Sequence, residues 1–239
     1  MNKKVVIIGS GFSSISAASY LAQAGFVVSV FEKNPSLGGR ARVTEKEGFT
    51  FDMGPSWYWM PDVFEGYFQD FGKKVSDYYD LVRLSPSYRV FWNDAPDDIP
   101  ADMEELEAYF EQYEKGSGEK LKQFMSEAKT KYEIGMREFV TKPSLSITEF
   151  MTLDIAKKGL SLDLFKPISK HIRSYFKHPK LIELLEFPVL FLGAKPQNTP
   201  SLYSLMNYAD MALGTWYPMG GMGKIVDGMV EVAKELGVK

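Results

Sequence analysis

Two glycines near the N-terminus and a glutamate further along have the spacing of a nucleotide-binding turn. Gly9 and Gly11 follow the apolar run 5–8, and Glu32 lies 21 residues after Gly11 (32 − 11 = 21). Glycine permits a tight turn and close backbone approach, so that amides at a helix start face a pyrophosphate with the helix dipole behind them. A carboxylate about 20 residues later accepts a hydrogen bond from a ribose hydroxyl. The residues expected at the pyrophosphate are Gly9, Gly11, Phe12 and Ser13, with Glu32 at the ribose.

The apolar pattern predicts the elements that must position these residues. Four β-branched residues at 5–8 indicate a buried parallel strand, the alanine-rich stretch 15–25 indicates a helix, and 27–31 indicates a second strand. These elements form a β-α-β unit. Ser14 stands where the third glycine of the dinucleotide fingerprint allows close packing of helix on strand, and serine is small enough to keep the match.

A double glycine and an arginine follow the ribose acid and separate the possible cofactors. An NAD-binding unit needs nothing special here, whereas the sequence Gly38-Gly39-Arg40 resembles the flavin-binding amine oxidase and carotenoid desaturase superfamily. The resemblance implies that Gly39 and Arg40 bring amides and a guanidinium to the phosphate and flavin side of FAD. A plain glycine loop with a solvated arginine is the alternative.

A second motif of that superfamily follows. Residues 42–50 alternate like a strand, and the glycine-proline turn after Asp52 ends it. In the superfamily an Asp-x-Gly-Pro element of this kind runs beside the flavin ring, which implies ring contacts for Gly54, Pro55 and Ser56. Three aromatic residues come next, and they are either core or the wall of an apolar substrate channel. They are Trp57, Tyr58 and Trp59.

Within the superfamily, three stretches of the chain are similar to bacterial phytoene desaturases: residues 54–65, 86–90 and 203–210. The resemblance implies an FAD-dependent desaturase that removes a hydride and a proton from a long polyene such as phytoene. Another flavoprotein oxidoreductase of the same fold, such as a carotenoid or retinoid oxidoreductase or an amine oxidase, is the alternative, as is an inactive fragment. The spacing of Asp and Glu residues singles out no catalytic base.

The expected fold class is α/β: a Rossmann-like FAD-binding domain with an inserted α+β substrate (cap) domain, truncated at the C-terminus. We expect the first segment of the FAD domain at 1–83, a mostly helical substrate domain at 84–213, and a segment returning towards the FAD domain at 214–239. Relatives in the family are roughly twice as long, so the resemblance implies an N-terminal half.

Composition limits the other possibilities. The chain has no cysteine, and its two histidines, His171 and His178, are expected at the surface rather than on a metal. Residues 157–180 carry seven Lys or Arg against one acid, a charge of +6 in a chain of −3, which leaves −9 elsewhere (−3 − 6 = −9). With the apolar run 184–192 this predicts either a membrane-contacting surface or a solvated helix face.

We expect a cytoplasmic protein, peripheral on the inner face of the cell membrane, that does not cross it and binds no nucleic acid. The oligomeric state is open.

Overall fold

The structure is a computed structural model that describes residues 3–140, 145–146 and 166–239. It divides into two compact units, one formed by Met1–Leu84 with Thr215–Lys239 and the other by Ser85–Gly214. Each unit has its own hydrophobic core.

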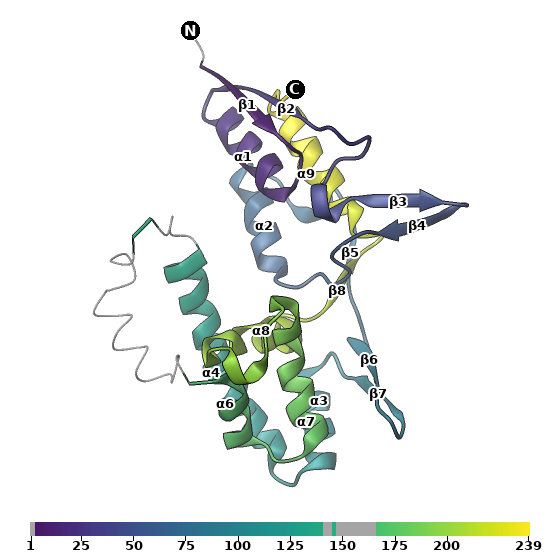
Figure 1. Ribbon diagram of the computed structural model, residues 1–239, viewed down its shortest axis with the longest axis vertical. Coiled ribbons are helices and arrows are strands. Elements are labelled where there is room, and N and C mark those ends of the chain that lie inside the picture. Colours follow the sequence, from purple (N-terminus) through teal and green to yellow (C-terminus); the bar gives the residue numbers. More distant parts are fainter. Residues whose placement is uncertain (1–2, 141–144, 147–165) are drawn as a thin grey trace. The chain divides into compact units, whose positions relative to one another are not determined.

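The first unit begins with the predicted β-α-β arrangement (Figure 1). Strands β1 (Lys4–Ile8) and β2 (Val27–Phe31) are parallel and joined by helix α1 (Phe12–Gln23). Gly25, with φ of +88°, lies just past the helix end, where a left-handed residue commonly stops a helix.

The remaining elements of this unit come from distant parts of the sequence. After the short helix η1 (Gly39–Ala41) come the hairpin β3 (Val43–Lys46) and β4 (Phe49–Asp52), helix α2 (Pro61–Asp70) and η2 (Val75–Asp77). Strand β5 (Leu81–Arg83) pairs antiparallel with β8 (Trp216–Pro218), and helix α9 (Gly223–Glu235) follows β8.

Helix α9 packs against α1, and α1 packs against β2 and β1. Val28 on β2 is buried, at 1% exposed. The apolar side chains of α9, which include Ile225 and Met229, join Ile15 of α1 in the core of this unit. The last residue of the chain lies along the other edge of β2, where Lys239 N donates to Val28 O at 3.1 Å and its carbonyl accepts from Val30 N at 2.6 Å.

The second unit is mostly helical. It contains the hairpin β6 (Tyr88–Phe91) and β7 (Pro96–Ile99), helices α3 (Met103–Tyr113) and α4 (Ser117–Ile134), and the π-helical η3 (Gly135–Val140). Further along the chain it contains α6 (Ile168–Tyr175), α7 (Pro179–Glu186), η5 (Phe187–Leu192), η6 (Pro196–Asn198), η7 (Ser201–Ser204), α8 (Leu205–Asn207) and the π-helical η8 (Tyr208–Ala212). Asp102 caps α3 by accepting from the backbone amides of Glu104 and Glu105.

Three expectations from the sequence are wrong in detail. The run 5–8 forms strand β1 but is not buried: Val6 is 62% and Ile8 87% exposed, because successive side chains of a strand face opposite sides and these two face the uncovered one. The stretch 42–50 is not one strand, because a turn with Glu47 at φ 53° and Gly48 at φ 82° folds it back into the hairpin β3–β4. His171 is not at the surface: it is 4% exposed, with its Nε2 3.2 Å from Lys131 Nζ. The helical pattern around His171 puts it on the inner face of α6.

None of the helices in the described ranges combines the length and the apolar character needed to span a membrane.

The core of the first unit predicts a matched pair of stability effects. Phe68 is 0% exposed and its ring contacts Tyr67, Tyr78 and Tyr79, whereas Phe49 on β4 is 67% exposed. We expect Phe68→Ala to lower the free energy of unfolding by about 3–5 kcal/mol through lost burial and a residual cavity. Phe49→Ala should change it by less than about 0.5 kcal/mol. Urea unfolding measures both, and equal effects would contradict this core.

Candidate functional site

The turn between β1 and α1 has the geometry expected for an anion at a helix start. Gly9 has φ of +95°, a conformation that favours glycine, and its amide donates to Phe31 O at 2.7 Å. Gly11 is extended (φ −72°, ψ 170°) as the N-cap of α1, without a side-chain cap. The first amides of α1 therefore remain available to a ligand.

Glu32, just after β2, is bound to this turn through Ser10. Its Oε2 accepts from Ser10 N at 3.0 Å and from Ser10 Oγ at 2.8 Å. Its Oε1 accepts from Asn34 N at 2.9 Å and from Asn34 Nδ2 at 2.7 Å. The hydrogen bond from the Asn34 amide, followed by those from Ser10, lowers the pKa of Glu32 to about 2. The carboxylate is therefore charged at neutral pH.

A second glycine turn packs directly on the first. Gly38 N donates to Ser10 O at 2.9 Å, and a Cβ placed on Gly39 would lie 3.1 Å from Gly11 Cα. The turn after β4 packs even more tightly against the second glycine turn, because a Cβ on Gly54 would lie 2.1 Å from Arg40 O. Side chains at these glycines would hold the backbones apart, so the motifs meet only because the glycines lack them.

These turns enclose a cavity of about 590 Å³. Its lining comes from all three motifs: Gly11, Phe12, Ser13, Ser14, Gly38, Arg40, Ala41, Gly54 and Pro55. Amides at the start of α1 and the Arg40 guanidinium suit a phosphate group, and the Gly54-Pro55 turn lines the cavity beside them.

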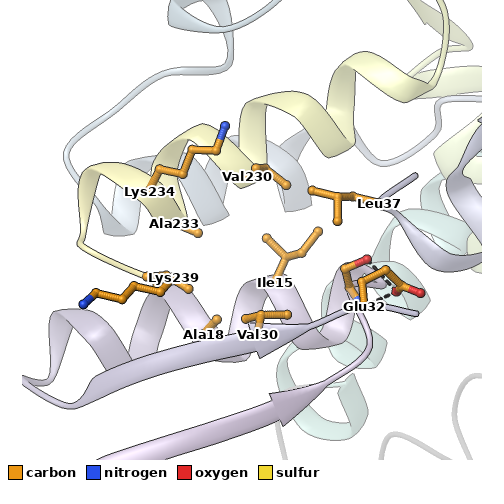
Figure 2. Close-up of a pocket in the computed structure, with 11 residues that line it drawn as sticks. Ile15, Ala18, Val30, Glu32, Leu37, Val230, Ala233, Lys234 and Lys239 are labelled. Atoms are coloured by element: carbon orange, nitrogen blue, oxygen red, sulfur yellow. Dashed lines mark hydrogen bonds between the residues drawn. The ribbon is translucent and has the colours of Figure 1, made fainter. Parts of the chain in front are cut away.

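A smaller and mostly apolar cavity of about 150 Å³ lies between α1, β2 and α9 (Figure 2). Glu32 and Ser10 are at one end, and the chain terminus at Lys239 is at the other. Ile15 and Val230 line it from the two helices. Ser10 lines this cavity and Gly11 lines the larger one, so both cavities border the same turn.

The aromatic triplet after this site splits between surface and core. Tyr58 is 1% exposed, and its hydroxyl lies 3.0 Å from that of Tyr79. Trp57 and Trp59 are half-buried and in edge contact, with ring centroids 5.6 Å apart. Trp59 Nε1 donates to Thr215 Oγ1 at 2.8 Å. The alternation follows from the extended backbone, which turns successive side chains to opposite sides.

The structure brings most of the proposed cofactor residues together. Those that line the larger cavity are Gly11, Phe12, Ser13, Arg40, Gly54 and Pro55, and Glu32 lines the smaller one. Gly9 and Gly39 form the turns behind the cavities, whereas Ser56 is exposed and lines neither.

Sequence reasoning missed Ser10 and Asn34, which hold Glu32, and Gly38 and Ala41, which line the larger cavity. Ser10 lies between the two fingerprint glycines, and that position could have identified it as a residue of the site. Within the described ranges, no group of three or more His, Asp or Glu side chains is arranged to hold a metal ion.

The close approach at Gly54 predicts a strong position dependence for added methyl groups. Gly54→Ala would place Cβ against Arg40 O, so the two turns must separate, and we expect a loss of about 1–3 kcal/mol in the free energy of unfolding. Gly66, within α2, has open space for at least 4 Å around the position that a Cβ would take, and Gly66→Ala should stabilise by about 0.5–1 kcal/mol. Thermal and urea unfolding test the pair. A Gly54→Ala protein as stable as Gly66→Ala would contradict the contact between the two turns.

Comparisons with known proteins identify the family. The family described as flavin containing amine oxidoreductase matches residues 13–239. A carotenoid 3,4-desaturase of Haloarcula japonica is 45% identical over 98% of this chain and 48% of its own length. A 4,4′-diapophytoene desaturase (4,4′-diaponeurosporene-forming) of Staphylococcus aureus is 34% identical over 98% of this chain and 47% of its own length. The chain thus spans about half the length of these curated relatives, and its predicted resemblance to carotenoid desaturases is confirmed.

Solved structures share the fold. An oxidoreductase from Methanosarcina mazei has a TM-score of 0.59 at 19% identity, with 99% of this chain and 50% of that chain covered. A putrescine oxidase variant has a TM-score of 0.59 at 14% identity, with 100% and 51% covered. These neighbours confirm the predicted fold class. The match over residues 13–239 shows that the chain belongs to the flavin containing amine oxidoreductase family.

Proposed function

We propose that this chain binds FAD and acts within a carotenoid desaturase that removes a hydride and a proton from a long polyene. The observation that carries the proposal is the convergence of three separate motifs on one cavity, with the charged Glu32 held beside it. The two relatives described above, both carrying the name desaturase, support the choice of reaction.

The residues present fit an adenine dinucleotide in three parts. Glu32, at the mouth of the smaller cavity, is a charged acceptor for a ribose hydroxyl, and the apolar walls of that cavity suit an adenine. The amides beside Gly11 and the Arg40 guanidinium suit the pyrophosphate. The Gly54-Pro55 turn would lie beside the flavin ring.

When bound, the flavin supplies the hydride acceptor for the reaction. The chain's own part is to bind, to orient and to exclude water, because a neutral polyene offers no group for a polar side chain to hold. Trp57 and Trp59 are the side chains we propose for the wall of the polyene channel, while Tyr58 belongs to the core. In the overall reaction, one carbon would lose a hydride to the bound flavin and the adjacent carbon would release a proton to solvent, so that a C=C bond forms between them.

Flavin binding by the 239-residue chain tests the first part of the proposal. We expect the purified protein to retain or take up FAD, read by flavin absorbance and by fluorescence titration. Glu32→Ala should weaken FAD binding by at least about tenfold, because hydrogen bonds to a charged group contribute about 1.5–3 kcal/mol. Glu45→Ala, on the exposed hairpin strand β3, is the control and should leave the affinity unchanged. Equal affinities for both variants would count against Glu32 as the ribose acceptor.

Pigment formation tests the reaction. Expression of the gene's whole reading frame in a host that accumulates phytoene should yield carotenoids with longer conjugated systems, seen as red-shifted absorption of the extracts. A flavin-loaded protein that leaves every supplied polyene unchanged, yet oxidises an amine, would favour the amine oxidase alternative.

We also propose that the second unit contacts a membrane surface through an apolar tip, defined as Leu190, Phe191 and Leu192 of η5. These side chains are 64%, 51% and 42% exposed, while Val189 beside them is buried. The positive charge of residues 157–180 supports membrane contact less than the sequence indicated. Arg173 pairs with Glu186, and part of this basic segment lies outside the described residues. Lys180 pairs with Asp94 at 2.9 Å. The apolar tip therefore carries this proposal.

Vesicle binding tests the apolar tip. The double variant Leu190→Ser with Phe191→Ser should bind vesicles of anionic phospholipid at least about tenfold more weakly, since each large side chain loses about 1.5–3 kcal/mol of burial. Phe91→Ser, on β6 of the same unit and 77% exposed, is the matched control and should bind as the wild type does. Co-sedimentation measures both. A double variant that sediments fully would refute the tip as the contact.

A further inference from the structure

The Glu32 carboxylate already has its hydrogen-bonding capacity filled by its own chain. Ser10 and Asn34 each donate two hydrogen bonds to it, one from the backbone amide and one from the side chain. A carboxylate offers about four lone-pair positions. A ribose hydroxyl can therefore donate to Glu32 only where one of these four donors withdraws.

The two backbone amides are fixed by the turns that contain them, so the side-chain donors are the ones free to exchange. They differ in their surroundings. Ser10 is 2% exposed, and its Oγ also accepts from Gly38 N at 3.3 Å, which ties it to the second glycine turn. Asn34 lies half-buried in the loop after β2, where water can receive its amide. Withdrawal of Asn34 Nδ2 leaves a solvated group, whereas withdrawal of Ser10 Oγ leaves a buried polar atom without its acceptor.

We propose that the Asn34 side chain holds the place of a ribose hydroxyl on Glu32, while Ser10 is a positioning residue that fixes the carboxylate for the incoming sugar. This rests on the proposed dinucleotide function and deepens it. In the structure Asn34 Nδ2 donates to Oε1, and on binding the sugar hydroxyl takes over that position. Ser10 keeps Oε2 directed at the turn in both states.

The proposal predicts opposite outcomes for two small truncations. Calorimetry with ADP and with 2′,3′-dideoxy-ADP measures how strongly the protein recognises the ribose hydroxyls, as the ratio of the two affinities. Asn34→Ala should bind ADP as tightly as the wild type or up to about fivefold more tightly, with the ratio kept, because a competing donor is gone. Ser10→Ala should bind ADP about tenfold more weakly with a ratio near one, while binding of the dideoxy analogue stays the same. Ser36→Ala, in the same loop but lining a neighbouring groove, is the control.

A merely structural role would lower the affinity for both nucleotides together, so the ratio separates positioning from folding. Asn34→Ala losing ADP affinity as Ser10→Ala does would overturn the place-holding role. A Ser10→Ala protein with an unchanged ratio would overturn the positioning role, and Ser10→Gly, which removes the same hydroxyl, repeats the test if Ser10→Ala does not fold. A folded wild type that binds neither nucleotide would instead overturn the dinucleotide function itself.

Discussion

The first unit depends on backbone lying against backbone. A Cβ on Gly39 would press against Gly11 at 3.1 Å, and a Cβ on Gly54 would clash with the Arg40 carbonyl at 2.1 Å. This close approach makes one cavity out of turns that lie far apart in the sequence. Amides at the start of α1 then contribute to its polar surface, which suits a ligand whose phosphates need donors in fixed positions.

Glu32 adds the negative charge that this surface of donors would otherwise lack. Its four hydrogen bonds all come from the two turns that flank it, and these neutral donors lower its pKa. A lysine or arginine at that place would attract the phosphates as well as the carboxylate. On the proposed function, neutral donors keep the pyrophosphate and ribose regions distinct, and the Arg40 guanidinium, which lines the larger cavity, would act at the phosphate side.

Local pattern was sufficient for some of this arrangement and insufficient for the rest. The β-branched run before Gly9 and the 21-residue spacing from Gly11 to Glu32 identify the β-α-β unit, because the periodicity of a strand or a helix can be recognised from residues that are close in the sequence. The hairpin at Glu47 and Gly48 was missed, since alternation continues across a tight turn when the turn residues are polar. The contact of Gly54 with Arg40, and the burial of Tyr58, depend on tertiary packing that no local pattern reports.

The same distinction explains why the cofactor was easier to infer than the substrate. A dinucleotide is read by backbone geometry, which demands glycine at a few positions and therefore leaves a mark in the sequence. On the proposed function, a polyene would be read by apolar side chains such as Trp57 and Trp59, and many apolar combinations fill the same volume. The two relatives discussed above carry names that differ in the polyene and in the bond formed. Substrate choice would then change through side chains that face the channel, while the glycine turns and Glu32 would keep the cofactor in place.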